Sequence, residues 1–436
     1  MKLFITTCLL MTLNAAQAFD FTPNELIVKL KPGQSLPKLP NVKSVQNLFE
    51  NVYVLRTTNL LKLEAALKNN PSVIYTERNH HSERRVLPKP DPASSITLDK
   101  MVPQDSQFND PLIGKVWSFL DAKKNGVSVN EAYKEYGTTN TTPVIVAVVD
   151  TGVDIHHEDL KDVIWVNKKE IPGNGIDDDG NGYIDDINGI NTLVRDANGL
   201  ATMDNKDTHS HGTHVSGTIG AKQNNGIGIA GIASNVLIMG IRTVPNEGDE
   251  TDIDVAEAFV YAARNGARII NCSFGKSSNE GRQLIPDTLK YIGDKFGVLV
   301  IAAAGNDSSD IDKNLTYPAS FNSDNLLIIA STTNTGGMSY FSNYGKINVD
   351  VAAPGSNVYS TVPGNKYESM SGTSMATPTT VGVAAEILSH NPDLTVAQLK
   401  DILIRSVTKI DSFKNKMVSG GRIDLLKGLE LAKTIK

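Results

Sequence analysis

Cysteine is almost absent from this chain of 436 residues, which contains only Cys8 and Cys272. Two cysteines cannot build the network of disulfides that stabilises many small secreted domains, so packing or bound metal must stabilise the fold. Long apolar runs are scarce too. Beyond the N-terminus, no window approaches the roughly 20 apolar residues of a membrane-spanning helix. The formal net charge of −6 and the lack of a dominant basic run argue against a nucleic-acid-binding surface.

Residues 1–18 have the composition of a secretory signal peptide. Lys2 supplies the positive charge, residues 3–13 are mostly apolar, and Ala16-Gln17-Ala18 has the small-x-small pattern of a cleavage site. A buried N-terminal helix is the alternative interpretation. Removal of this segment takes Cys8 away and leaves Cys272 without an intrachain partner. We therefore expect a secreted protein, extracellular or periplasmic, and a monomer.

The rest of the chain divides into three segments. Residues 19–87 combine strand-like runs with one stretch of helical spacing that follows Asn59, a possible N-cap, and they predict a small α+β domain. Residues 88–104 begin with closely spaced prolines and lack periodicity, which is typical of a linker. In residues 105–436, continuous apolar runs alternate with helical stretches, which predicts an α/β domain.

The apolar runs of the third segment lack the alternation that is typical of half-exposed strands. They lie at residues 144–149, 236–241, 269–270, 298–304 and 326–330. Such runs fit strands that are buried on both faces of a parallel sheet. One helical stretch between them ends before Gly266, and another begins with the capping-box pair Thr395 and Gln398. The pattern predicts a doubly wound, mostly parallel sheet with helices on both faces.

Three short motifs of this segment carry side chains suited to nucleophilic catalysis. They are Asp150-Thr151-Gly152, His211-Gly212-Thr213-His214 and Gly372-Thr373-Ser374-Met375-Ala376. The order Asp, His, Ser is one of the known linear orders of a catalytic triad. A bare serine is a weak nucleophile, whereas an imidazole whose tautomer is fixed by a carboxylate can take the serine proton. We predict that Asp150, His211 and Ser374 meet at one edge of the sheet; for Asp150 alone, a turn or N-cap role is the simpler alternative.

Asn306 is a fourth candidate, because it follows the predicted strand at 298–304 and would lie at the same edge. Its amide can donate a hydrogen bond to an oxyanion, together with the N–H of Ser374 at the start of a predicted helix. The alternative is an asparagine that serves only a turn.

Together these motifs resemble the subtilases, the family of subtilisin-like serine endopeptidases. The resemblance covers residues 105–432 and implies that protein or peptide substrates are hydrolysed through an acyl-enzyme. It implies that substrate is bound by Ser273, Phe274 and Gly275 and by Ala302, Ala303, Ala304 and Gly305. Residues 19–87 resemble the inhibitory propeptide of the family, and Tyr317-Pro318 resembles a turn with a cis proline. Specificity stays open, because the alanines favour apolar side chains whereas Asp307 favours basic ones.

A dense run of carboxylates lies between the aspartate and histidine motifs. Its members match positions 1, 3, 5 and 9 of the EF-hand pattern: Asp177, Asp179, Asn181 and Asp185. Position 12 is Asn188 rather than glutamate, and Asp186 is a candidate replacement. Carboxylates so close together repel one another unless a hard cation neutralises them. We therefore predict bound calcium, with a solvated acidic turn as the alternative.

The resemblance to subtilases implies a second calcium site in the loop after the histidine motif. Its ligands would be the backbone carbonyls of Gln223, Ile227 and Ile229 and the side chains of Asn225 and Asp159.

Other interpretations of the same residues remain. His209, His211 and His214 have a spacing that a zinc site can use, and Cys272 fits a small buried hydrophobic residue better than a catalytic thiol. A non-catalytic, subtilase-like binding protein is the alternative function. A dinucleotide-binding enzyme would share the sheet, but the chain has no Gly-rich fingerprint after a first strand.

Overall fold

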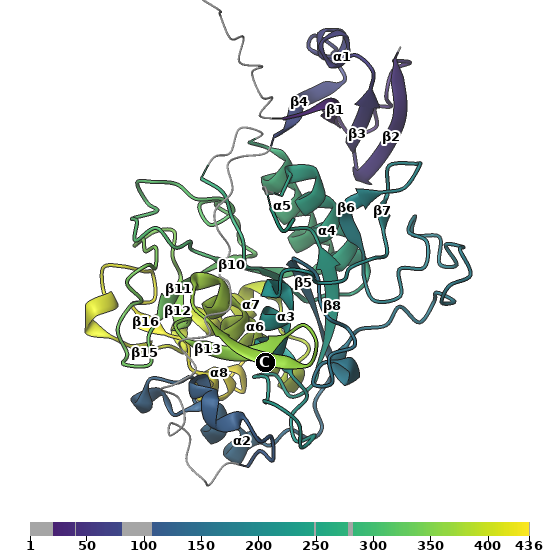
Figure 1. Ribbon diagram of the computed structural model, residues 1–436. Helices are drawn as coiled ribbons and strands as arrows, with labels where there is room; N and C mark the ends of the chain where they lie inside the picture. Colours follow the sequence, from purple (N-terminus) through teal and green to yellow (C-terminus); the bar gives the residue numbers. More distant parts are fainter. Residues whose placement is uncertain (1–20, 40, 81–106, 248–249, 278–281, 436) are drawn as a thin grey trace, which may run out of the picture.

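The computed structural model describes residues 21–39, 41–80, 107–247, 250–277 and 282–435. The predicted signal peptide (1–18) and linker (88–104) lie outside these residues. Figure 1 shows a small body at one end of the molecule and a larger body below it. We call the described part of residues 21–80 the N-terminal unit and the described residues from 107 onward the large unit.

The N-terminal unit is an antiparallel four-stranded sheet with one helix. Its elements are β1 (Phe21–Leu30), β2 (Val42–Phe49), β3 (Val52–Thr57), α1 (Leu60–Leu67) and β4 (Val73–His80), and the strand order is β2-β3-β1-β4. Asn59 accepts the N–H of Lys62 at 3.0 Å and caps α1, as predicted. The buried leucines of α1 pack against Leu26 and Val28 of β1. β2 is not among the predicted strands, because polar residues interrupt its apolar side chains.

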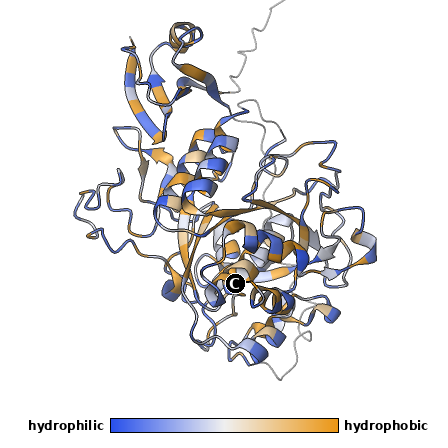
Figure 2. Ribbon diagram, turned by 180° about the vertical axis from the view of Figure 1, so that it is seen from behind, coloured by the Kyte–Doolittle hydropathy of each residue, from blue (hydrophilic) through white to orange (hydrophobic). Residues whose placement is uncertain are grey.

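A ten-stranded sheet forms the centre of the large unit. Its strands in spatial order are β15 (Thr408–Lys409), β16 (Gly421–Arg422), β12 (Val351–Pro354), β11 (Leu326–Thr332), β10 (Leu299–Ala303), β9 (Ile269–Cys272), β5 (Val144–Asp150), β8 (Val236–Arg242), β6 (Asn191–Arg195) and β7 (Ala201–Thr202). The strands from β12 to β8 run parallel, and Figure 2 shows that they are mostly hydrophobic. The predicted apolar runs are β5, β8, β9, β10 and β11, so the prediction of a mostly parallel sheet is confirmed. The strands that the sequence did not reveal are only two to five residues long.

Helices cover both faces of this sheet. One face carries α4 (Asp252–Arg264) and α5 (Leu284–Phe296), and the other carries α3 (His211–Gly220) and α6 (Thr373–His390), with α2 (Val129–Tyr136), α7 (Val396–Arg405) and α8 (Leu425–Ala432) outside α6. Successive residues of a strand point to opposite faces. Val146 and Val148 of β5 therefore join the core under α3 and α6, whereas Ala147 and Val149 join the core under α4 and α5.

Short elements complete the large unit. They are the hairpin of β13 (Val358–Val362) and β14 (Lys366–Met370) and the 3₁₀ turns η2 (Ile113–Lys115), η3 (Trp117–Phe119), η4 (Ala122–Lys124), η5 (Lys161–Val163) and η6 (Asp411–Phe413). Cys272 is a free thiol, fully buried in β9, as predicted, and burial raises its pKa well above the usual value. Among the described residues, no helix combines the length and the apolar character that crossing a membrane would need.

The predicted helix ends agree with the structure with one exception. Thr395 and Gln398 form a capping box at α7, and Gly266 beyond α4 has a φ of +86°. Ser374 was predicted to open a helix from Met375 to Leu388; this helix, α6, begins at Thr373, so Ser374 is its second residue.

The sheet of the N-terminal unit has a second apolar face, which packs against α4 and α5 (Figure 1). Ile27 and Val54 belong to the same core as residues of these helices, and the ring of Phe49 stacks on Tyr291 with centroids 4.8 Å apart. The two units therefore share a core.

Polar side chains of β4 meet the first turns of the same two helices. Glu77 accepts the N–H groups of Gln283 and Leu284 at 3.1 and 3.2 Å, and Asn79 accepts the N–H of Ile253 at 3.2 Å. The first N–H groups of a helix have no intrahelical acceptor. The N-terminal unit thus completes the hydrogen bonding of α4 and α5.

Candidate active site

Asp150 and His211 form a buried pair at the carboxyl edge of the sheet. Asp150 is the last residue of β5 and His211 the first of α3, and the distance from His211 Nδ1 to Asp150 Oδ1 is 2.7 Å. Their side chains are 1% and 0% exposed, respectively. Because the carboxylate oxygen can only accept, Nδ1 carries the proton. In the part of the chain that the structure describes, Nε2 of His211 has no hydrogen-bond partner, so its lone pair can accept a proton.

Ser374 lies in the first turn of α6, which packs against α3. Its hydroxyl donates to the backbone oxygen of Ser273 at 2.8 Å, and the hydroxyl of Ser273 donates to the backbone oxygen of Ser374 at 3.0 Å. The structure therefore brings the three motifs to one edge of the sheet, with Ser374 Oγ hydrogen-bonded to a carbonyl rather than to the imidazole.

Asn306 follows β10 and is exposed. Its Oδ1 accepts two hydrogen bonds from Thr373, from the N–H at 2.8 Å and from the hydroxyl at 2.9 Å. With Oδ1 occupied in this way, the amide nitrogen of Asn306 is the group left to donate. Thr373 was not a predicted site residue; its position directly before Ser374 is the only sequence signal for this contact.

The two predicted substrate segments leave neighbouring parallel strands at the same end. Cys272 of β9 pairs with Ala302 of β10 in parallel, so the chain after Cys272 and the chain after Ala303 leave the sheet at the same edge. Gly275 lies against the Tyr317-Pro318 peptide bond, which is cis as the resemblance implied. A Cβ at Gly275 would lie 2.7 Å from the carbonyl oxygen of Tyr317, so only glycine fits there.

The comparisons with known proteins agree with this arrangement. The sequence profile of the subtilase family matches residues 141–421, more than half of the chain. The chain belongs to the subtilase family.

Among its relatives is subtilisin-like protease 1 of Plasmodium berghei, 34% identical over 345 residues that cover 75% of this chain and 55% of the relative. The thermophilic serine proteinase of Bacillus sp. strain AK1 is 32% identical and covers 81% of this chain and 71% of its own length. The chain thus spans about half the length of the Plasmodium relative. Fervidolysin from Fervidobacterium pennivorans superposes over 94% of this chain and 61% of its own with a TM-score of 0.69 and 23% identity, which shows a shared fold.

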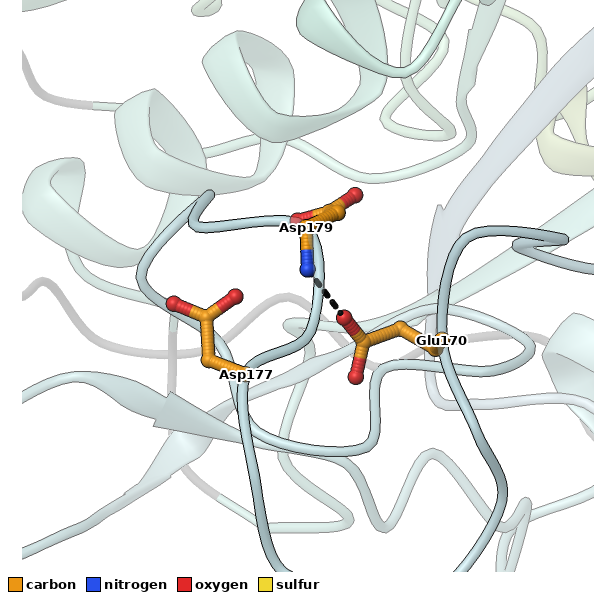
Figure 3. A group of neighbouring side chains, drawn as sticks. All are labelled: Glu170, Asp177 and Asp179. Carbon is orange, nitrogen blue, oxygen red and sulfur yellow. Dashed lines mark hydrogen bonds between the residues drawn. The ribbon is translucent and has the colours of Figure 1, made fainter.

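The acidic loop of this subtilase brings together three carboxylates, those of Glu170, Asp177 and Asp179 (Figure 3). Each offers one oxygen, and these oxygens all lie within 4.8 Å of one another. Glu170 has no local sequence signal as a ligand, because it precedes the EF-hand-like run and reaches the loop only through the fold. Glu170 is buried and accepts the N–H groups of Asp178 and Asp179 at 2.9 and 3.0 Å.

Two other predicted ligands of this loop lie differently. The carboxylate of Asp185 accepts the N–H groups of residues 173–175 and lies outside the three-carboxylate group. Asn181 donates its backbone N–H to both Asp177 and Asp179, and its side-chain amide bonds to Asp186 at 3.0 Å. Burial raises the pKa of Asp186 above its usual value.

The second predicted calcium loop lies beside Asp159. The carboxylate accepts the side-chain amide of Asn225 at 2.8 Å and the N–H of Ile229 at 2.9 Å, and burial raises the pKa of Asp159 to about 6. Asp110, which was not a predicted ligand, accepts the N–H groups of residues 224 and 225. The side chain of Gln223 donates to the backbone carbonyl of Gly231 at 2.8 Å, away from Asp159. The predicted ligand from Gln223 is its backbone carbonyl, not its side chain.

The histidines do not form the zinc cluster that was the alternative. Nε2 of His214 faces the backbone oxygens of Val358 and Glu368 at 2.9 and 3.2 Å, and burial lowers the pKa of His214 to about 3. Nδ1 of His211 is bound to Asp150. Across the described ranges, the one group of carboxylates, thiols and imidazoles close enough to hold an ion is that of Glu170, Asp177 and Asp179.

Proposed function

We propose that this subtilase is a secreted serine endopeptidase, made as a zymogen, that cleaves peptide bonds with Asp150, His211 and Ser374. The observation that carries the proposal is the buried hydrogen bond of 2.7 Å between Asp150 and His211, with Nε2 of the imidazole left free in the described structure. The secretory composition of residues 1–18 supports export.

The first half of the reaction begins with a change in the Ser374 side chain. Its hydroxyl leaves the carbonyl of Ser273 and turns to Nε2 of His211, which takes the proton as Oγ attacks the scissile carbonyl. Asp150 holds the imidazole tautomer and stabilises the imidazolium. His211 then gives the proton to the leaving amine, and the C–N bond breaks to leave an acyl-enzyme.

The oxyanion of the tetrahedral intermediate is held by the amide of Asn306 and the N–H of Ser374. The hydrogen bonds from Thr373 to Asn306 Oδ1 support this role, because they occupy the oxygen and leave the NH₂ group as the end that can donate. The N–H of Ser374 belongs to the first turn of α6, where backbone donors lack intrahelical acceptors and the dipole favours negative charge.

The second half of the reaction uses water. His211 takes a proton from the water as it attacks the acyl carbonyl, and Ser374 then leaves with that proton. Substrate backbone pairs with residues 273–275 as an added strand, and residues 302–305 flank the side chain before the scissile bond.

The N-terminal unit acts as an intramolecular inhibitor and folding aid until it is cut away. Its shared core with α4 and α5, together with the caps from Glu77 and Asn79, supports docking in a fixed orientation. Arg84-Arg85, beyond the described part of this unit, is a candidate site for cleavage by another protease.

Calcium stabilises the large unit. Glu170, Asp177 and Asp179 would hold the ion in the acidic loop, since closely spaced oxygen donors suit a hard cation and are unfavourable without one. Asp159 and Asn225, with the carbonyls of residues 223, 227 and 229, would hold a second. Neither ion takes part in the chemical steps.

A fluorophosphonate probe tests the activity directly, because it reacts only with an activated serine. We expect labelling of the native protein at Ser374 and none in Ser374→Ala or His211→Ala. A folded native protein that stays unlabelled and cleaves no peptide library would favour the alternative, a subtilase-like binding protein.

A further inference from the structure

A buried carboxylate beside the proposed triad has no part in the steps above. Asp207 lies in the loop that leads into α3 and is 3% exposed. Among the described residues, no lysine, arginine or histidine side chain pairs with this carboxylate, and it accepts five hydrogen bonds, all from neutral donors.

The donors come from two segments, one that follows Asp150 and one that surrounds His211. Oδ1 accepts the hydroxyl of Thr151 at 3.0 Å and the N–H groups of His209 and Ser210 at 2.8 and 2.9 Å. Oδ2 accepts the N–H and the hydroxyl of Thr213 at 3.0 and 2.6 Å. Thr151 directly follows Asp150, and the other three residues surround His211.

Thr151 closes the connection between these segments. Its hydroxyl donates to Asp207 and accepts the N–H of Gly212 at 3.0 Å. Two hydrogen bonds therefore run from Asp207 through Thr151 to the residue next to His211, in parallel with the direct bond from Asp150 to His211.

The loop needs such an anchor, because its backbone is strained. Ser210, directly before His211, has a φ of +93°, which side-chain-bearing residues rarely adopt. A Cβ at Gly212 would lie 2.1 Å from the carbonyl oxygen of Gly152, so the start of α3 is pressed against the turn after Asp150. Without the bond from the Ser210 N–H to Asp207, the loop can relax and carry His211 with it.

We propose that Asp207 is a positioning residue of the active site, which holds the imidazole of His211 in register with Asp150 by binding both segments. The inference rests on the proposed function. A displacement of about 1 Å in a catalytic group can cost on the order of 100-fold in rate, so a group that never touches substrate can still govern kcat.

The test compares three variants with a matched control. Asp207→Asn keeps the size of the side chain but replaces one acceptor with a donor that faces other donors. Thr151→Val removes the bridging hydroxyl, and Thr151→Ser restores it. Asp424→Asn is the control, because Asp424 is also a buried carboxylate at a helix start, that of α8, where it binds Thr408 and Lys427.

We expect Asp207→Asn and Thr151→Val to lower kcat and the rate of fluorophosphonate labelling by about 10- to 100-fold, with KM nearly unchanged. Thr151→Ser and Asp424→Asn should keep the native kcat even where their melting temperatures fall. Native kcat in folded Thr151→Val and Asp207→Asn would overturn the proposal. Should Asp207→Asn fail to fold, the pair Thr151→Val and Thr151→Ser decides the question alone.

A second measurement is independent of catalysis. The proton between His211 and Asp150 should give a low-field NMR resonance, assigned by its loss in His211→Ala. We expect this resonance to shift or broaden in Asp207→Asn and to stay in place in Asp424→Asn. An unchanged resonance in Asp207→Asn would overturn the positioning role even if the protein proved to have no protease activity.

Discussion

The two units of this molecule are stabilised in different ways. The large unit has a hydrophobic core on each face of its sheet. Its own strands and helices form both cores, except that residues of the N-terminal unit join the core at α4 and α5. The N-terminal unit has one small core under α1 and shares its second apolar face with α4 and α5. Separation therefore uncovers one whole face of the small sheet, whereas the large unit keeps most of its burial.

The candidate catalytic residues follow the same division. All four belong to the large unit, at strand ends and helix starts that its sheet fixes. The N-terminal unit contributes caps and apolar cover to two helices but no triad residue. Cutting the chain between the units should thus release an inhibitor and leave the catalytic geometry in place.

The largest effect is expected from Ser374→Ala, which removes the nucleophile while both units stay folded. Loss of the serine should lower kcat on the order of 10⁶-fold. The chain should accumulate as a full-length precursor, detected by intact mass and N-terminal sequencing. Ser371→Ala, which changes an exposed serine just before α6, should process normally. Normal maturation of Ser374→Ala would assign processing to another protease, with Arg84-Arg85 as the first site to examine.

Asn306→Ala, which removes a predicted oxyanion donor of the large unit, should give the next largest loss. Removal of one oxyanion donor costs about 2.7–4 kcal/mol in transition-state stabilisation, a figure measured in a subtilisin. We expect the loss in kcat with KM little changed, for the precursor's own cleavage and for added peptides alike. Asn314→Ala, at an exposed asparagine outside the candidate site, is the matched control. A loss confined to KM would mean that Asn306 binds the ground state and not the oxyanion.

Most of the candidate catalytic residues at the carboxyl edge of the sheet could be predicted from the sequence, because their signals are local. Buried parallel strands appear as unbroken apolar runs, and their carboxyl ends meet at one edge of the sheet. The sequence alone therefore predicts that Asp150 and Asn306 lie at this edge. His211 and Ser374 occur in motifs with helix starts. The rotamer of Ser374, turned to the carbonyl of Ser273, has no such signal, because it depends on a segment 101 residues away.

The residues that the sequence did not reveal act through contacts between distant segments. Glu170 joins the acidic loop from outside the EF-hand-like run, and Thr373 fixes Asn306 across 67 residues. Asp207 is one carboxylate among many until the fold places Thr151 beside it. In the N-terminal unit, β2 was not predicted from the sequence. Its polar residues interrupt the alternation of apolar and polar side chains that is visible in its partner strand β3.

Calcium removal should affect the large unit more than the docking of the N-terminal unit. At a free concentration about 100 times the Kd, a ligand adds about 2.7 kcal/mol to the free energy of unfolding. We expect EGTA to lower the melting temperature of the Ser374→Ala protein, in which self-digestion cannot interfere, and Ca²⁺ to restore it. Glu170→Gln should reduce this response, whereas Asp162→Asn, at an exposed carboxylate outside the group, should keep it. Equal melting in Ca²⁺ and EGTA would remove calcium from the proposal.

The smallest effect, and the one that most directly probes the contact between the units, concerns Glu77. Burial raises the pKa of this carboxyl to about 8, and the nearby carboxylates of Asp252 and Asp287 add to the rise. Lys276 pairs with Asp252, and Lys29 and Tyr75 bind Asp287. Two cations and one phenol therefore also lie near Glu77. The docked state then holds a proton that an undocked glutamate, with its ordinary pKa near 4.5, releases.

The sign of the pH dependence follows from that difference. Docking is strongest below about pH 4.5 and weakens as the pH rises to about 8, by at most about tenfold per pH unit for one proton. Hydrogen exchange of the β4 amides in full-length Ser374→Ala, corrected for intrinsic exchange, should show this loss of protection. Glu77→Gln, which cannot ionise, should show a flatter profile at the same pH values. Protection that grows with pH in the native sequence would mean that the N–H groups of Gln283 and Leu284 keep Glu77 ionised, and that its charge, not its proton, holds the two units together.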